Sequence, residues 1–184
     1  MKIYLLNIKY CKFDYDSLFN ELDDNTKKII NSLNKEEDKK IKPIKEILIK
    51  RYTQNDERIK EKCYFDIVHS RDIIALIRDE NIDVGIDVEF IDENITLRPY
   101  ENKINLDTSK IDFYTYRTRK EALAKCFGIN LYEDNKLSNK KNNWHKCLGI
   151  PVVIESLKLN DYMLSFAYKS KNKIHYDMEV LESM

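Results

Sequence analysis

The sequence predicts an α+β protein. Apolar residues recur at helical spacing in residues 17–52 and 112–127, whereas short alternating or apolar runs fill residues 64–89 and 152–168. The connections between these short runs favour antiparallel pairing of the strands. With 184 residues, 3 glycines and 3 prolines, the chain suits one large domain or two small ones that share a core, without a flexible linker.

The first third is predicted to contain one strand followed by helices. Residues 3–8 form the strand, residues 17–34 form one or two helices, and residues 35–52 form a second helical stretch. Because proline has no backbone N–H, Pro43 must start, kink or divide that second stretch. Three acidic residues lie in its first turn, as suits a helix N-terminus: Glu36, Glu37 and Asp38.

The rest of the chain is predicted to contain strands around one helix. Three strands, at 64–68, 73–77 and 82–89, are expected to form an antiparallel meander, and residues 94–110 are polar and ambiguous. Asp112 caps a helix that runs to about Phe127, and Gly128 ends it. Two further strands flank the turn Asn160-Asp161, and residues 174–180 add one more.

Composition restricts the partners and the compartment. The chain has 32 basic and 32 acidic residues, so no overall charge favours a polyanion, although residues 27–62 are mainly basic and residues 79–112 mainly acidic. The four cysteines form no Cys-x-x-Cys pair and are expected to be thiols of a reducing compartment. Without a signal peptide or a membrane-spanning run, the sequence predicts a cytoplasmic protein with no membrane partner.

The strand at 82–89 carries two carboxylates on one side. Its residues alternate, so Asp87 and Glu89 point the same way, with their side chains about 6–7 Å apart at the base. Two such carboxylates repel each other unless a cation lies between them, and oxygen ligands suit Mg²⁺. The alternative is the ordinary polar side of a half-exposed strand.

The helix at 112–127 presents three charged residues on one side. Arg117, Glu121 and Lys125 lie at i, i+4 and i+8, which also fits a surface ladder of ion pairs. His69 follows the strand at 64–68 in a polar turn, where a histidine is more often structural than catalytic. Neither observation identifies a function without further information.

Taken together, these segments resemble the phosphopantetheinyl transferases of the surfactin-synthetase-activating type. That family has the patterns F-N-x-S-H-S, G-[IV]-D-[IV]-E and W-[ST]-x-K-E-[AS]-x-x-K in this order. The matching segments are Phe65-Asp66-Ile67-Val68-His69-Ser70, Val84-Gly85-Ile86-Asp87-Val88-Glu89 and Arg119-Lys120-Glu121-Ala122-Leu123-Ala124-Lys125.

The resemblance implies a fold of two similar α+β halves packed side by side, with the active site in the cleft between them. Residues 1–81 would form the N-terminal half, and residues 82–184 would form the C-terminal half with the metal-binding motifs. The implied reaction moves the 4′-phosphopantetheine group of coenzyme A to a serine of an acyl or peptidyl carrier protein and releases 3′,5′-ADP. The carriers are those of fatty-acid, polyketide or nonribosomal-peptide biosynthesis, and the enzyme would be a monomer.

The resemblance also implies roles for individual residues. Asp87, Glu89 and Glu121 would hold Mg²⁺ against the coenzyme A pyrophosphate, and Glu121 would act as the base for the carrier serine. Lys125 would neutralise charge on the transferring phosphate, as phosphoryl transfer requires. His69 and Lys62 would contact coenzyme A, and Lys40 or Lys42 would do so in place of the arginine that the family has where Ile41 stands.

Several positions depart from the family patterns and leave other functions open. Asp66 replaces an asparagine, Val68 a serine, Tyr116 a tryptophan and Cys63 a proline. One alternative is a catalytically impaired protein of the same fold that binds coenzyme A or a carrier protein. A nucleic-acid-binding module that uses the basic residues 27–62 is disfavoured, because acidic residues interrupt that segment and its apolar positions suit a core.

Overall fold

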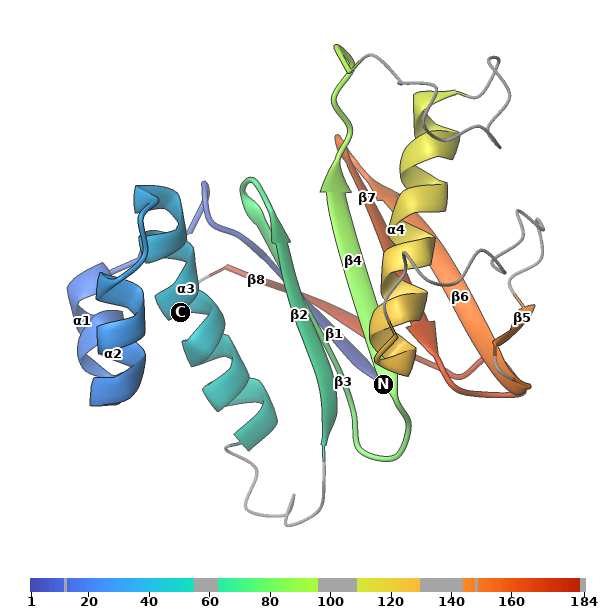
Figure 1. Ribbon diagram of the computed structural model, residues 1–184, viewed down its shortest axis with the longest axis horizontal. Coiled ribbons are helices and arrows are strands. Elements are labelled where there is room, and N and C mark those ends of the chain that lie inside the picture. Colours follow the sequence, from blue (N-terminus) through green and yellow to red (C-terminus); the bar gives the residue numbers. More distant parts are fainter. Residues whose placement is uncertain (12, 55–62, 96–108, 130–143, 148, 183–184) are drawn as a thin grey trace.

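The computed structural model describes the chain except residues 12, 55–62, 96–108, 130–143, 148 and 183–184 (Figure 1). Within these described residues the protein is α+β, with two four-stranded sheets of order β2-β3-β1-β8 and β4-β7-β6-β5. The elements are β1 Lys2–Asn7, α1 Tyr15–Asn20, α2 Asp24–Asn31, α3 Glu36–Ile49, a π-helical segment Lys50–Gln54, β2 Tyr64–Ser70, β3 Ile73–Asp79, β4 Val84–Phe90, α4 Lys110–Phe127, β5 Trp144–Cys147, β6 Ile150–Leu159, β7 Tyr162–Tyr168 and β8 Asp177–Leu181.

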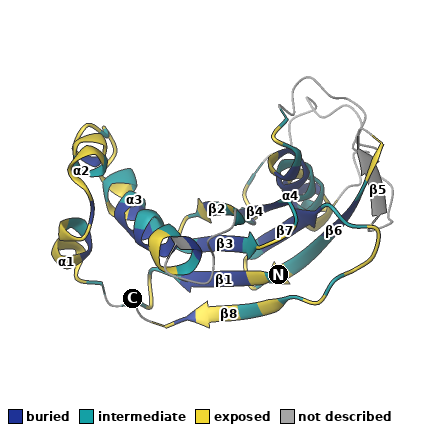
Figure 2. Cartoon of the chain, turned by 90° about the horizontal axis from the view of Figure 1, so that it is seen from below, coloured by how far each residue is buried: buried dark blue, intermediate teal, exposed yellow. Residues whose placement is uncertain are grey.

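Helices α1, α2 and α3 pack on one side of the first sheet. Tyr4 and Leu6 of β1 point toward α3 and join its buried apolar residues in one core cluster. Figure 2 shows buried residues running along β1 and β3 beside α3. Of the three effects predicted for Pro43, a helix start and a division are wrong, because α3 is one helix from Glu36 to Ile49, while a kink stays a prediction. Burial of the apolar side of α3 offsets the hydrogen bond that Pro43 cannot donate.

Helix α4 covers one side of the second sheet and lies unusually close to β4. A Cβ atom on Gly85 would come 2.2 Å from the carbonyl oxygen of Ala122 and 2.5 Å from the backbone nitrogen of Cys126, so only glycine permits this contact. Ser109 caps the helix, three residues before the predicted Asp112. Gly128 ends it in the left-handed conformation at φ 64°, as predicted.

The predicted three-strand meander is only partly correct. Strands β2 and β3 do form an antiparallel hairpin, but β4 pairs with β7 of the second sheet instead of β3. Strands β2 and β4 meet through side chains: Asp66 Oδ2 accepts a hydrogen bond from the Ile86 N–H, and Ser70 Oγ accepts one from the Phe90 N–H, each at 2.9 Å. We call this line of contact between β2 and β4 the seam. Helices α3 and α4 stand on either side of it (Figure 1).

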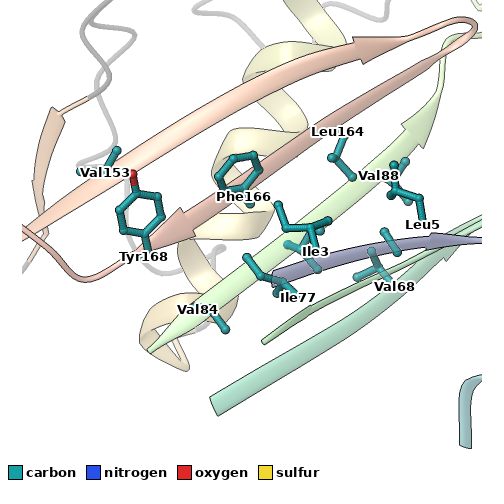
Figure 3. Close-up of a cluster of buried hydrophobic side chains, with 12 residues drawn as sticks. Ile3, Leu5, Val68, Ile77, Val84, Val88, Val153, Leu164, Phe166 and Tyr168 are labelled. Carbon is teal, nitrogen blue, oxygen red and sulfur yellow. The ribbon is translucent and has the colours of Figure 1, made fainter. Parts of the chain in front are cut away.

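A shared apolar core joins the sides of the two sheets that face away from the helices. Ile3 and Leu5 of β1 meet Val84 and Val88 of β4 there, together with Phe166 of β7 (Figure 3). The alternation predicted for the strand at 82–89 is therefore confirmed, because its apolar residues enter this core and its polar residues face α4. The two sheets behave as one packed body across the seam.

The C-terminal strand returns to the first sheet. Strand β8 pairs in parallel with β1, with Leu5 opposite Val180, so the last strand of the chain extends the sheet begun by the first. The division of the chain at residues 81 and 82 stays a prediction, as does the arrangement in two similar halves. The turn predicted at Asn160-Asp161 is confirmed, with Asn160 at φ 51° between β6 and β7. None of the helices in the described ranges is long and apolar enough to cross a bilayer.

Candidate functional site

An ion pair between Asp87 and Lys125 lies at the centre of the site. Asp87 is in the middle of β4 and is only 8% exposed, whereas Lys125 is in the last turn of α4. The Lys125 ammonium donates to Asp87 Oδ1 at 2.9 Å and to the Ile86 carbonyl at 3.0 Å. The close contact of α4 with Gly85 brings the two residues together, because it sets the last turns of α4 directly over β4.

The second carboxylate oxygen of Asp87 lacks a partner. Its Oδ2 is buried and has no hydrogen bond. Burial raises the pKa of Asp87 to about 6, and the charges of Glu89 and Glu121 add to this rise, while Lys125 opposes it. A buried oxygen without a partner is rare in native proteins and points to a proton or a cation that binds there. Burial therefore moves the pKa of Asp87 toward neutral pH.

The other two predicted carboxylates surround Asp87. Glu89 lies two residues further along β4, and its Oε1 forms an ion pair with Arg117 Nε at 3.0 Å. Glu121, one turn before Lys125 on the same side of α4, is half-buried and forms no ion pair with another described residue. The predicted row of Arg117, Glu121 and Lys125 therefore faces β4, and two of its three members pair with carboxylates of that strand.

The carboxylates fit a hard cation by their chemistry, although they do not already enclose one. Among the described residues, no three aspartate, glutamate, histidine or cysteine side chains converge closely enough to hold a metal ion. Asp87 Oδ2 is nonetheless unsatisfied, and Glu89 and Glu121 both act on the pKa of Asp87. Three oxygen donors of this kind suit Mg²⁺, which binds a few carboxylates and keeps positions for water and phosphate.

The first sheet contributes a second group of charges across the seam. His69, at the end of β2, is exposed, and its pKa is lowered by partial burial of the ring and by the nearby Lys45. Burial also lowers the pKa of Lys45, on which the charges of Asp66 and Lys125 act as well. Lys45 was not predicted from the sequence as a site residue. The sequence feature that marks it is its position among the isoleucines of α3. Lys45 on α3 and Lys125 on α4 thus lie close enough across the seam for the charge of Lys125 to act on the pKa of Lys45.

Of the remaining predicted contacts, Lys42 is near enough to help lower the pKa of Lys45. Lys40 is exposed near the start of α3, and Lys42 pairs with Glu46 at 2.7 Å. Ile41 is buried in the core of the first sheet, so this position cannot present a polar group to the seam. Lys62 lies outside the described residues.

A buried carboxylate paired with a lysine, with two more carboxylates beside it, defines a site suited to phosphate chemistry. The family profile of pyrimidine 5′-nucleotidase (UMPH-1) matches residues 17–103, slightly under half of the chain. The matched part includes Asp87 and Glu89 and ends before Glu121 and Lys125. No curated protein matches the sequence.

This match contradicts the phosphopantetheinyl transferase interpretation. The expected transferase activity, the coenzyme A and carrier-protein partners, and the role in fatty-acid, polyketide or nonribosomal-peptide biosynthesis are therefore wrong, as is the impaired binding protein of the same type. The physical reason is that the short motifs report carboxylates and a lysine suited to metal-assisted phosphate chemistry, which do not specify the group that accepts the phosphate.

Two departures from the transferase patterns also have structural consequences. Val68 is buried in the core between the sheets, where the family pattern has a serine. Asp66 uses its carboxylate to bind the backbone of β4 at Ile86. Asp66 and Val68 therefore help to join the two sheets.

Proposed function

We propose that the protein is a Mg²⁺-dependent phosphatase that hydrolyses nucleoside 5′-monophosphates at the Asp87–Lys125 site. The observation that carries this proposal is the buried Asp87, whose Oδ2 has no partner and whose Oδ1 binds Lys125. The similarity of residues 17–103 to pyrimidine 5′-nucleotidase supports a nucleotide substrate, with pyrimidines preferred.

The site residues would divide between binding the metal ion and binding the substrate phosphate. Asp87, Glu89 and Glu121 would hold Mg²⁺, which when bound supplies positive charge against the phosphate oxygens. Lys125 is one-third exposed and borders both Asp87 and the adjoining pocket, so its ammonium can also bind the substrate phosphate. Arg117 holds Glu89 in position from the neighbouring turn of α4. Binding and orientation of the phosphate thus come from both β4 and α4.

Glu121 is the residue placed to accept a proton. It is half-buried and has no ion pair with another described residue, so the carboxylate oxygen that would not hold Mg²⁺ can take a proton from water. The water oxygen then forms a bond to phosphorus, and the ester bond between phosphorus and the nucleoside O5′ breaks. Glu121 then gives the proton it took from water to O5′, so the nucleoside leaves as the 5′-alcohol, the Glu121 carboxylate is restored, and inorganic phosphate is the second product. Lys125 stabilises the negative charge that develops on the phosphate oxygens.

Phosphate release from UMP, CMP, AMP and GMP tests the proposal, with Mg²⁺ or with EDTA. We expect release that needs Mg²⁺, is faster for the pyrimidine nucleotides, and falls by about 10²–10⁴-fold in Glu121→Gln. Glu21→Gln is the matched control, because Glu21 is an exposed glutamate of the distant α1 region, paired only with Arg51. Absence of phosphate release from all four nucleotides by the folded protein would refute the proposal.

A parallel reaction distinguishes hydrolysis from group transfer. The same protein is incubated with Mg²⁺, coenzyme A and an apo carrier protein, and the carrier mass is measured. The family match leads us to expect no change in mass. A gain equal to the phosphopantetheine group would reinstate the transferase interpretation and show that the profile match to residues 17–103 reflects a similarity without shared activity.

A further inference from the structure

A pocket of about 380 Å³ adjoins the Asp87–Lys125 site. It lies where three elements meet at one end of the seam: the start of β2, the start of β4 and the end of α4. Lys125 lines this pocket and also binds Asp87, so the two features share one ammonium group. The volume is within the range of about 300–1,000 Å³ that is usual for small-molecule sites.

The residues that line the pocket include aromatic ones as well as charged ones. Tyr64 and Phe65 of β2 and Phe127 of α4 all line it. Phe65 is 42% exposed, so much of its side chain is open to solvent beside the pocket. Exposed aromatic rings beside a pocket present flat apolar surface on which another ring can stack.

The charges of the pocket are already neutralised. Lys169 binds Asp83 at 2.6 Å, and its ammonium also lies 4.6 Å from the centre of the Phe127 ring. Lys125 pairs with Asp87. Lys169 is thus occupied within the pocket, whereas Lys125 at its border is one-third exposed and can still bind a phosphate group. A purely apolar chain would have to desolvate both ion pairs. A flat ring with polar edges is compatible with both the aromatic wall and the paired charges.

We infer that this pocket binds the nucleoside of the substrate, with the base stacked on Phe65, while the phosphate lies at Lys125 and Asp87. This inference rests on the proposed function, since it takes the substrate to be a nucleotide. Lys125 connects the two parts of the site, because the same side chain borders the pocket and the carboxylate. Phe65 is thus the residue that sets affinity for the base, separately from the residues that act on the phosphate.

Binding of a nucleoside without phosphate tests the inference independently of catalysis. Uridine binding is measured by saturation-transfer NMR with EDTA present, in wild type, Phe65→Ala, Phe65→Tyr and Tyr10→Ala. Stacking of a base on an aromatic side chain is worth about 5- to 150-fold in affinity, so Phe65→Ala should weaken binding by at least about 5-fold. Phe65→Tyr should retain the affinity. Tyr10 is a matched control, because it is 77% exposed and lies outside the pocket.

The outcomes separate this inference from the proposed function. If Phe65→Ala binds uridine as wild type does, or if wild type does not bind uridine, the pocket does not hold the nucleoside. If UMP is hydrolysed and Phe65→Ala raises KM without changing kcat, both proposals are supported. If UMP is not hydrolysed but uridine binding depends on Phe65, the proposed function fails and the pocket assignment stands. Because Phe65 is exposed, the alanine variant is expected to fold.

Discussion

Replacement of Asp87 by asparagine should stabilise the metal-free protein at neutral pH. Asp87 is almost fully buried, and burial raises its pKa to about 6. The unfolded chain ionises near the ordinary value of 3.8, so the folded state holds this proton more tightly than the unfolded state. The wild type therefore loses stability as pH rises from about 4 to about 6, and the loss is complete above that range.

The size of the stability gain in Asp87→Asn follows from the pKa shift of Asp87. A pKa change of about 2 units corresponds to about 3 kcal/mol of stability, which is the upper limit for the gain in Asp87→Asn above about pH 7. Loss of the Lys125 partner reduces the gain. That cost is small, because Lys125 is one-third exposed to water and still donates to the Ile86 carbonyl. We therefore expect a gain of about 1–3 kcal/mol at neutral pH and almost none near pH 4.

Urea unfolding followed by circular dichroism measures the difference between the two proteins. The titrations are run with EDTA at intervals between about pH 4 and about pH 8, where the difference should grow with pH. Asp16→Asn, a change of an exposed aspartate in α1, should follow wild type within about 0.5 kcal/mol at every pH. The reasoning would be refuted by an Asp87→Asn variant that is no more stable than wild type at about pH 8, or whose gain is independent of pH.

Three further predictions concern the metal, the base and the contact between helix and sheet. Mg²⁺ should raise the unfolding temperature of wild type in calorimetry but not that of Asp87→Asn, because the partnerless Oδ2 is lost; equal shifts would remove Asp87 from the metal site. Glu121→Gln should leave the urea midpoint unchanged while phosphate release falls, since Glu121 has no ion pair among the described residues; a lower midpoint would indicate a structural role. Gly85→Ala should lower the free energy of unfolding by about 3 kcal/mol or more, because its Cβ would come 2.2 Å from the Ala122 carbonyl oxygen. Gly149→Ala is the control: it has open space but a φ of 80°, and should lower the free energy of unfolding by about 1–2 kcal/mol. Equal losses for the two variants in urea unfolding would argue against the close contact at Gly85.

Local sequence rules predicted most of the elements. The alternation of residues 82–89 placed Asp87 and Glu89 on one side of a strand, and the structure confirms it, because period-two burial depends only on neighbours along the strand. Gly128 ended α4 as predicted, since the left-handed C-terminal conformation favours glycine. The N-cap of α4 is Ser109 instead of the predicted Asp112, because Ser109 Oγ accepts a hydrogen bond from the Asp112 N–H.

The candidate site was only partly accessible from the sequence. Helical spacing placed Glu121 and Lys125 on one side of α4, but only the tertiary structure shows that this side faces Asp87 and that Arg117 pairs with Glu89. Lys45 could not be found from the sequence, because its neighbours across the seam are distant in the chain. The family interpretation failed for a related reason: carboxylates and a lysine at suitable spacing are common to several phosphate chemistries.

Spacing along the chain was therefore sufficient for the α+β class, for most helix and strand positions, and for the shared side of the two β4 carboxylates. It was insufficient for the partners of the strands: β4 pairs with β7, and β8 pairs in parallel with β1. Strand pairing depends on which apolar sides bury each other, and β1 and β8 are separated by nearly the whole chain. The same long-range packing joined β2 and β4 at the seam through Asp66 and Ser70 and brought α4 over Asp87.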